Sequence, residues 1–306
     1  METGMAETLK LGNTFFMFTD RNLFLVPERE YKLIRQLREK EHTFLERRCI
    51  PGMTDCGGRV ITCIVCIEEP SPEDTISPLC RDVHYVICKK CMEKESKTAV
   101  ECPFCQEKKS DNKAFQEEIL DAVLSRMPHQ TLPSLEIGPN MSVETLMRLP
   151  RENKVSLNNL CLSDAFFFKL LSKTVLEVTN SITLFAHDNS LDCCLEEIDA
   201  RTNKPTSIHI GEYTGEEMKQ IYENIETMPK NNIQAIAKEI HAVENGICVL
   251  LKLLDGADGY IPDLLLESPK EECIKEILGT ESNLSWVGKV KRLKLTGCAI
   301  QILPKI

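Results

Sequence analysis

The chain has 306 residues, 42% hydrophobic and 27% charged, which is the composition of a folded protein large enough for about two domains. Its net charge of −10 and pI near 5.3 argue against broad attraction to nucleic-acid phosphates. Since no apolar stretch is long enough to span a bilayer and the first residues lack a signal-peptide pattern, we expect a soluble cytoplasmic or nuclear protein that binds neither nucleic acid nor membrane.

The N-terminal segment, assigned to residues 1–58, predicts a hairpin followed by a helix. Residues 15–27 (FFMFTDRNLFLVP) are two apolar runs separated by a polar turn at Thr19–Asn22, which favours a β-hairpin. Pro27 suits the first turn of a helix. A helix is predicted over Glu28–Arg48 because apolar residues recur on one side of it, namely Leu33, Ile34, Leu37, Phe44 and Leu45.

Between residues 63 and 105 the chain concentrates residues that bind metals. Three C-x-x-C pairs are joined by one Cys and one His, and the eight residues are Cys63, Cys66, Cys80, His84, Cys88, Cys91, Cys102 and Cys105. Thiolates and imidazole in this number fit two tetrahedral zinc sites. Sites with four protein ligands leave no position for a reactive water, so the two zinc ions are predicted to be structural and a zinc hydrolase is excluded. The other eight of the 15 cysteines are scattered and are expected to be reduced thiols.

The order of these ligands resembles that of a RING finger, here residues 59–108. The gaps between successive ligands are 2, 13, 3, 3, 2, 10 and 2 residues, and the single His stands fourth, whereas a PHD finger would have it fifth. The resemblance implies interleaved binding, with Cys63, Cys66, Cys88 and Cys91 on one zinc and the other four ligands on the second. Spacing alone leaves sequential pairing open.

RING fingers are chiefly ubiquitin ligases, which hold a ubiquitin-charged conjugating enzyme beside a substrate and need no catalytic residue of their own. The resemblance implies that Val65, Pro103 and Phe104 contact the conjugating enzyme, and that Gln106 stands where a basic residue often bridges enzyme and ubiquitin. Glu95 departs from the pattern, because many active members have Trp there. A nonenzymatic zinc-binding adaptor is therefore the alternative function.

A second helix and a linker are predicted after the cysteine-rich region. Asp111 can cap a helix in residues 109–127 whose apolar face packs on the RING or on the N-terminal helix, with a homodimer contact as the alternative; the face comprises Phe115, Ile119, Leu120, Val123, Leu124 and Met127. A run of prolines and a glycine then predicts a linker over residues 128–144.

Residues 145–306 show a weak repeat that resembles leucine-rich repeats. The last copy, VKRLKLTGCAIQILP, fits the template with Val290, Leu293, Leu295, Cys298, Ile300 and Leu303. Earlier copies centre on Leu160, Ile182, Ile208, Ile236 and Leu264, with helices predicted over Asp164–Leu176 and Gly215–Met228. The predicted fold is thus multidomain α+β, with a zinc-stapled RING and flanking helices followed by a leucine-rich-repeat-like solenoid; an ordinary α/β domain is the alternative.

In a solenoid of this kind the alternate strand positions would line a concave surface that recruits a protein substrate. The residues expected there are Asn158, Asn159, Ser181, Thr183, Ser207, His209, Lys291, Arg292 and Lys294. The sequence thus predicts a ubiquitin transferase whose partners are a conjugating enzyme, ubiquitin and a substrate protein.

Overall fold

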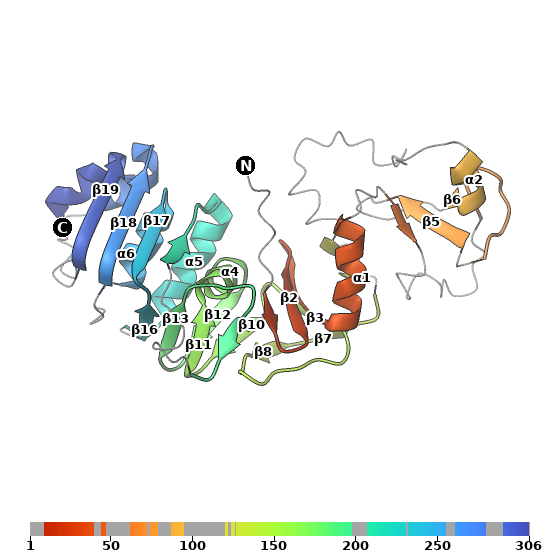
Figure 1. The fold of residues 1–306 in the computed structure, drawn as a ribbon, viewed down its shortest axis with the longest axis horizontal. Coiled ribbons are helices and arrows are strands. Elements are labelled where there is room, and N and C mark those ends of the chain that lie inside the picture. Colours follow the sequence, from red (N-terminus) through yellow and green to blue (C-terminus); the bar gives the residue numbers. More distant parts are fainter. Residues whose placement is uncertain are drawn as a thin grey trace. The chain divides into compact units, whose positions relative to one another are not determined.

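The computed structural model describes residues 9–39, 44–46, 62–71, 74–78, 87–94, 120–121, 124–125, 127–197, 207–230, 232–254, 261–279 and 290–305. The fold mixes helices with several small sheets (Figure 1). The chain packs as two compact units: the N-terminal unit is Asn13–Leu132 with Val143–Pro150, and the C-terminal unit is Met1–Gly12, Pro133–Ser142 and Arg151–Ile306. Among the described residues, no helix combines the length and apolar character needed to cross a membrane.

A hairpin forms the centre of the N-terminal unit. Strands β2 (Thr14–Phe18) and β3 (Asn22–Pro27) pair antiparallel, which confirms the predicted hairpin. In its turn the Thr19 hydroxyl accepts a 3.0 Å hydrogen bond from the backbone N–H of Asn22. Strand β3 also pairs antiparallel with β9 (Met147–Pro150), which pairs parallel with β7 (Gln130–Thr131).

The first helix is shorter than predicted. Helix α1 spans Glu28–Glu39, and the ring of its Tyr31 stacks on Phe15 of β2 with centroids 3.8 Å apart. The prediction that Phe44 and Leu45 belong to this helix is wrong, because they lie in strand β4 (Phe44–Glu46). Strand β4 pairs antiparallel with β5 (Thr75–Pro78), so strand pairing between distant segments overrides the helical spacing of these two residues.

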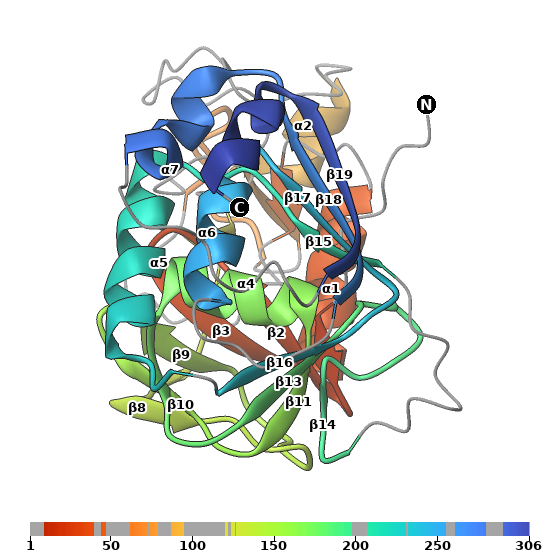
Figure 2. The same ribbon diagram turned by 90° about the vertical axis from the view of Figure 1, so that its left-hand side faces the viewer.

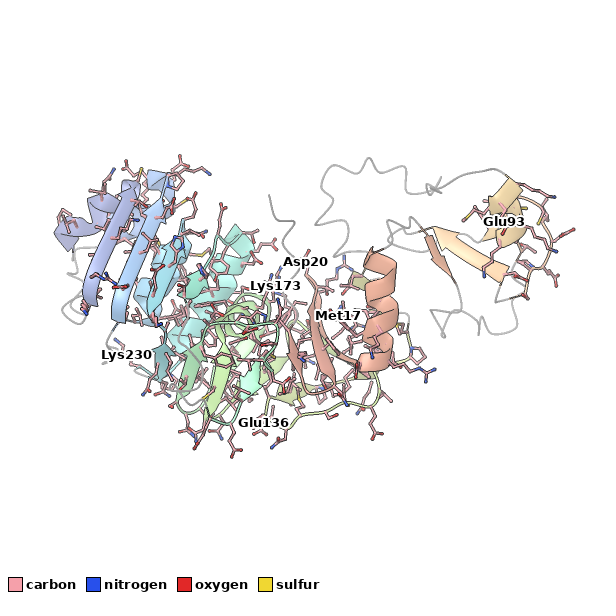
Figure 3. The ribbon with its side chains drawn as sticks, viewed as in Figure 1. Met17, Asp20, Glu93, Glu136, Lys173 and Lys230 are labelled. Carbon is pink, nitrogen blue, oxygen red and sulfur yellow. The ribbon has the colours of Figure 1, made fainter. Side chains whose placement is uncertain are left out.

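The predicted flanking helix is described at residues 120–121 and 124–125, all of which are helical. Leu124 is fully buried in one apolar cluster with Ile34 of α1, which confirms that this segment packs against the N-terminal helix. Met17, labelled in Figure 3, belongs to the same cluster. Asp121 adds a polar connection, since its carboxylate accepts hydrogen bonds of 2.6 Å from Thr19 and 2.7 Å from Asn22.

The described residues of the C-terminal unit form three sheets. The first is parallel in the order β12 (Val175–Val178), β10 (Lys154–Leu157), β8 (Ser134–Glu136). The second has the order β14 (Cys194–Leu195), β11 (Leu160–Ser163), β13 (Ile182–Phe185), β16 (Ile233–Ile236), with only β14 antiparallel. The third is parallel in the order β15 (Ser207–Ile210), β17 (Glu239–Val243), β18 (Ile261–Ser268), β19 (Val290–Gly297). A two-residue strand, β1 (Lys10–Leu11), precedes them, and the backbone N–H of Cys193 donates to Lys10 O at 2.7 Å.

Residues 128–144, where the linker was predicted, contain β7 and β8. Pairing of β8 with β10 is extended by a hydrogen bond from the backbone N–H of Ile137 to Ser156 O at 3.1 Å. Leu135, Ile137 and Val143 are buried, so this segment contributes apolar side chains to the packed interior.

Both helices predicted in the C-terminal unit are present, and each follows a strand. Helix α4 spans Asp164–Lys173 and helix α5 spans Gly215–Thr227, so both begin where predicted, and α4 ends three residues early while α5 ends one residue early. Thr174 ends α4 in an extended conformation, and its hydroxyl donates to Leu170 O at 2.8 Å. Lys173, labelled in Figure 3, forms a 3.1 Å ion pair with Glu217 of α5. Helices α5 and α6 (Gly246–Leu253) lie on one side of β15, β17 and β18 (Figure 2).

The register tests the predicted repeat frame. Leu160 pairs with Ile182 and Leu264 pairs with Leu293, as predicted. Ile208, however, pairs with Ile240 rather than with Ile236, so the copy centred on Ile236 was placed four residues too early. The correction follows from burial, because Ile240 is 4% exposed. The predicted pivots also fall in two different sheets.

Four elements are described after β18. They are the 3-10 helix η4 (Glu271–Ile274), helix α7 (Lys275–Gly279), strand β19 and the 3-10 helix η6 (Cys298–Lys305). Ile300 and Leu303, which the template predicted to be inward, are more than half exposed, whereas Ala299 and Ile302 are fully buried. Side chains three residues apart lie on the same side of a 3-10 helix, so Ala299 and Ile302 are buried on the same side.

Candidate metal centre

Two short segments of the N-terminal unit each carry two cysteines. Cys63 and Cys66 lie in a tight turn, closed by hydrogen bonds from the backbone N–H of Ile67 to Cys63 O (2.8 Å) and from that of Cys63 to Glu68 O (2.9 Å). Cys88 ends strand β6 (Ile87–Cys88) and Cys91 lies in helix α2 (Lys89–Lys94). A separation of three residues at the start of a helix places both thiols on one side.

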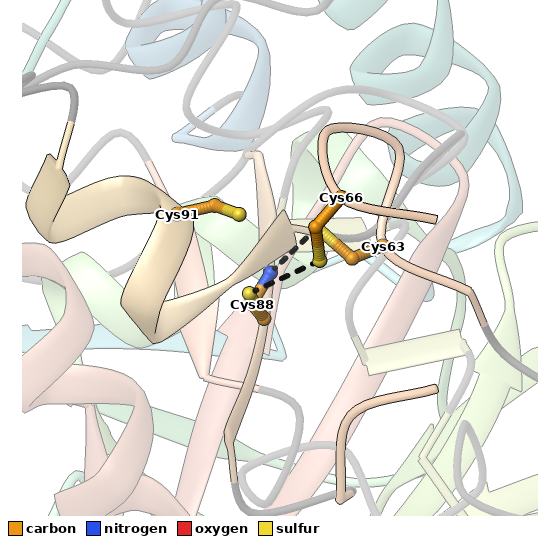
Figure 4. Close-up of side chains that lie close together, drawn as sticks. All are labelled: Cys63, Cys66, Cys88 and Cys91. Carbon is orange, nitrogen blue, oxygen red and sulfur yellow. Dashed lines mark hydrogen bonds between the residues drawn. The ribbon is translucent and has the colours of Figure 1, made fainter. Parts of the chain in front are cut away.

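The four sulfur atoms of Cys63, Cys66, Cys88 and Cys91, here called the cysteine quartet, all lie within 4.8 Å of one another (Figure 4). The sulfurs of Cys66 and Cys88 are 3.8 Å apart. Two thiolates on one tetrahedral zinc, each about 2.3 Å from the ion, would be separated by roughly 3.8 Å. The quartet therefore has the donor type, number and spacing to hold a metal ion.

The backbone around Cys63 favours its thiolate. Its sulfur accepts a hydrogen bond from the backbone N–H of Cys88 at 3.3 Å (Figure 4). Burial acts to raise the pKa of the Cys63 thiol, but the backbone N–H groups of Cys66, Cys88 and Val65 outweigh it and lower that pKa to about 6. The pKa of Cys91 is raised to about 12, first by its hydrogen bond to Cys88 and then by burial. Four thiols this close cannot all ionise without a cation between them.

The structure thus brings together the four cysteines that the RING resemblance assigns to one ion. The other four predicted ligands (Cys80, His84, Cys102 and Cys105) lie outside the described residues, as do Glu95 and three of the predicted conjugating-enzyme contacts (Pro103, Phe104 and Gln106). Of the two predicted metal sites, the described residues therefore contain the ligands of one.

An apolar surface adjoins the quartet. Val65, the described member of the predicted conjugating-enzyme contacts, has 47% of its surface exposed. Its neighbours Ile64 and Ile67 are 46% and 78% exposed, so the turn displays three large apolar side chains. Ile64 and Ile67 were not predicted to belong to this surface. Their positions beside Cys63 and Cys66 could have indicated it, because a short metal-bound turn has no interior in which to bury large side chains.

The residues predicted to line a concave surface are distributed over several elements of the C-terminal unit. Ser207 and His209 of β15 share one face of the third sheet with Arg292 and Lys294 of β19, whereas Lys291 alternates to the other face, so its inclusion was wrong.

Two of the other expected residues lie in a turn. Asn158 and Asn159 connect β10 with β11, and Asn159 has a positive φ of 51°. Arg292 is also less available than the sequence suggested, because it forms an ion pair with Asp263 of the neighbouring strand β18. Among the predicted residues that share this face of the third sheet, Lys294 is therefore the exposed cation without that pairing.

Comparison with known proteins identifies no relative of this chain. No family model matches it, and neither a curated protein nor a solved structure is similar to it. The cysteine quartet and the apolar turn beside it are therefore the observations from which a class of protein is inferred.

Proposed function

We propose that this protein is a RING-type ubiquitin ligase whose cysteine-rich region holds two structural zinc ions. The observation that carries the proposal is the quartet, because its members come from the first and second C-x-x-C pairs with Cys80 and His84 between them in the sequence. This interleaving is the arrangement typical of a RING finger. The second ion would be held by Cys80, His84, Cys102 and Cys105.

The zinc ions would act through shape and not through chemistry of their own. A four-thiolate zinc site has a formal charge of −2 and no open position, so it cannot activate water. Its contribution is the folding energy that holds the turn carrying Ile64, Val65 and Ile67 in place. These side chains form an exposed apolar surface suited to docking a conjugating enzyme, together with Pro103, Phe104 and Gln106.

The reaction would then occur on the partner enzyme. A substrate Lys attacks the thioester that links ubiquitin to the conjugating enzyme, the amide forms, and the thiol of that enzyme leaves. The ligase contributes proximity and a constrained thioester geometry. The C-terminal unit, as a leucine-rich-repeat-like domain, would recruit the substrate through the exposed face of β15, β17, β18 and β19.

The second candidate is a nonenzymatic zinc adaptor that assembles proteins. Two residues of this chain favour it: Glu95 places a charge where active members often have Trp, and Gln106 lacks the cation that often contacts ubiquitin. A homodimer through the helices that flank the cysteine-rich region would fit either function.

The deciding experiment is a ubiquitin-transfer assay with the full chain. It contains activating enzyme, a panel of conjugating enzymes, ubiquitin and ATP, and the protein is first verified to hold two zinc ions. A ligase builds ubiquitin conjugates, Cys63→Ser abolishes them, and Val65→Asp abolishes them while both zinc ions are retained. Glu69→Ala, at an exposed residue near the same turn, is the matched control and stays active. Zinc-loaded protein that transfers no ubiquitin with any enzyme of the panel would establish the adaptor.

A further inference from the structure

The third sheet of the C-terminal unit ends at β19. Among the described residues, this eight-residue strand pairs only with β18, so it is the last in the order β15, β17, β18, β19 (Figure 1). An edge strand has backbone N–H and C=O groups on one side that no strand of its own sheet uses, and these groups can pair with the backbone of another chain. The edge of β19 therefore offers a template on which a further strand can form.

The buried face of the third sheet continues to this edge with less cover than it has further inside. Leu264 and Leu266 of β18 are 1% and 0% exposed, whereas their partners in β19, Leu293 and Leu295, are only partly buried. A strand added beside β19 would bring apolar side chains next to these two leucines and cover them. Hydrophobic burial would then add to the backbone hydrogen bonds in holding such a strand.

Helix η6, which follows β19, has three rows of side chains because a 3-10 helix makes one turn every three residues. One row, Ala299 and Ile302, is fully buried. A second row faces the segment that follows β18, since Cys298 Sγ donates to Pro269 O at 3.5 Å and Gln301 Nε2 donates to a carboxylate of η4 at 3.4 Å. The third row therefore points away from that segment.

This third row consists of Ile300 and Leu303, which are 56% and 58% exposed. The described part of the chain exposes only three other large apolar side chains, and all three lie in the turn beside the quartet. The side of η6 that faces away from the segment after β18 is the side on which a strand added to β19 would lie. The free edge of β19, its two partly buried leucines and this row of η6 thus form one surface, here called the terminal edge.

The charge of β19 selects the kind of chain that can pair with it. The strand carries three cations, Lys291, Arg292 and Lys294, and no anion, in a protein whose net charge is −10. Arg292 is paired with Asp263 of β18, whereas Lys291 and Lys294 are exposed, one on each face of the sheet. The β19 strand of a second copy would bring the same cations against them, and lysines on an edge strand are a common means of preventing such self-pairing. An acidic segment would meet opposite charges instead.

We propose that the terminal edge binds an extended acidic segment of a partner protein as an additional strand of the third sheet. Apolar residues of the segment would alternate with acidic ones, so that the apolar side chains cover Leu293, Leu295 and the exposed row of η6 while an acidic side chain on the opposite face meets Lys294. In the proposed ligase this segment would belong to the substrate, and only that assignment rests on the proposed function. The binding itself needs neither zinc nor ubiquitin.

The test measures binding of a fluorescent peptide to the full chain by anisotropy. The peptide has the length of β19 and alternates Glu and Val; a second peptide alternates Lys and Val and should not bind. N-methylation of alternate residues of the Glu–Val peptide should weaken its binding at least about tenfold, because backbone hydrogen bonds are lost. Lys294→Glu turns attraction into repulsion, and Leu303→Asp places a charge in the apolar contact, so each should weaken binding about tenfold.

Matched controls keep this test independent of the proposed ligase. Lys219→Glu makes the same charge change at a side chain of α5 that is 80% exposed and should leave peptide binding unchanged. Cys63→Ser should also leave it unchanged, because the quartet is not part of the terminal edge. Circular dichroism verifies that each variant is folded.

Two results would overturn the proposal. One is that wild-type protein fails to bind the Glu–Val peptide, or binds it no more tightly than the Lys294→Glu and Leu303→Asp variants do. The other is dimerisation of the wild type, measured by sedimentation, that Leu303→Asp abolishes, since a second copy would then be the occupant of the terminal edge.

Discussion

Asn224 of helix α5 allows the packing of the C-terminal unit to be tested by one substitution. Its side chain is 2% exposed and makes three hydrogen bonds to backbone at the end of α4 and the start of β12. Nδ2 donates to Leu171 O and to Thr174 O, both at 2.8 Å, and Oδ1 accepts from the backbone N–H of Leu176 at 2.9 Å. The side chain thus joins a helix, a strand and the turn between them.

Replacing this side chain with Ala leaves three backbone groups without partners. Each buried group left unsatisfied costs about 1–3 kcal/mol, so Asn224→Ala should lower the free energy of unfolding by about 4 kcal/mol. Asn224→Asp has the same shape, but it turns a carboxylate oxygen toward two carbonyl oxygens. It should therefore destabilise at least as strongly at pH 7.

Urea unfolding, followed by circular dichroism, measures the loss in free energy of unfolding. Hydrogen exchange shows which elements lose stability. Exchange should accelerate in α4, α5 and β12, while the hairpin β2–β3, in the other unit, keeps its protection. Glu226→Ala, at an exposed position on the same helix, is the control and should change stability by less than about 0.5 kcal/mol. A loss below about 1 kcal/mol for Asn224→Ala would refute the reasoning that these three hydrogen bonds fix the α4–β12 connection.

Three further predictions concern the metal centre, a half-buried carboxylate and a glycine. Cys88→Ser should release one zinc ion and unfold the surrounding turn, as measured by elemental analysis and by proteolysis; unchanged zinc content would contradict the quartet as a metal site. Burial acts to raise the pKa of the Glu217 carboxyl, but the backbone N–H of Thr214 and the ammonium group of Lys173 outweigh burial and lower that pKa. Its stabilising contribution is therefore present above the unfolded pKa of about 4.3 and is lost as pH falls through the lower folded value. Glu217→Gln should destabilise at pH 7, with the difference from wild type shrinking at pH 3; a difference independent of pH would argue against this. At Gly246 an added Cβ would lie 2.4 Å from Gly211 O, so Gly246→Ala should cost about 2 kcal/mol or more in thermal unfolding, whereas Gly279→Ala, with open space around it, should be tolerated.

Local patterns predicted those elements whose stability is largely local. The hairpin β2–β3 followed from two apolar runs and a polar turn, and α5 from its apolar spacing. The structure adds a capping box to α5, with Thr214 accepting from the backbone N–H of Glu217 at 3.3 Å while the Glu217 carboxylate accepts from that of Thr214 at 2.9 Å. Where both the period and the end signals lie within one segment, sequence suffices.

Predictions failed where a distant strand or a different helix type decided the outcome. Phe44 and Leu45 have helical spacing, but pairing with β5 makes them a strand. Ile300 and Leu303 fit the repeat template, but the 3-10 geometry of η6 buries Ala299 and Ile302 instead. In each case the sequence pattern was compatible with two periodicities, and packing selected one of them.

The sequence by itself predicted a metal site formed by cysteines, because the number and spacing of the thiols leave few other uses for them. Only the tertiary structure decided which thiols meet: Cys63 and Cys66 join Cys88 and Cys91 because a tight turn and the start of α2 face each other. Strand register likewise makes neighbours of His209 and His241, which are remote in sequence. Ligand type is a property of single residues, whereas a shared site is a property of their distances, which arise only on folding.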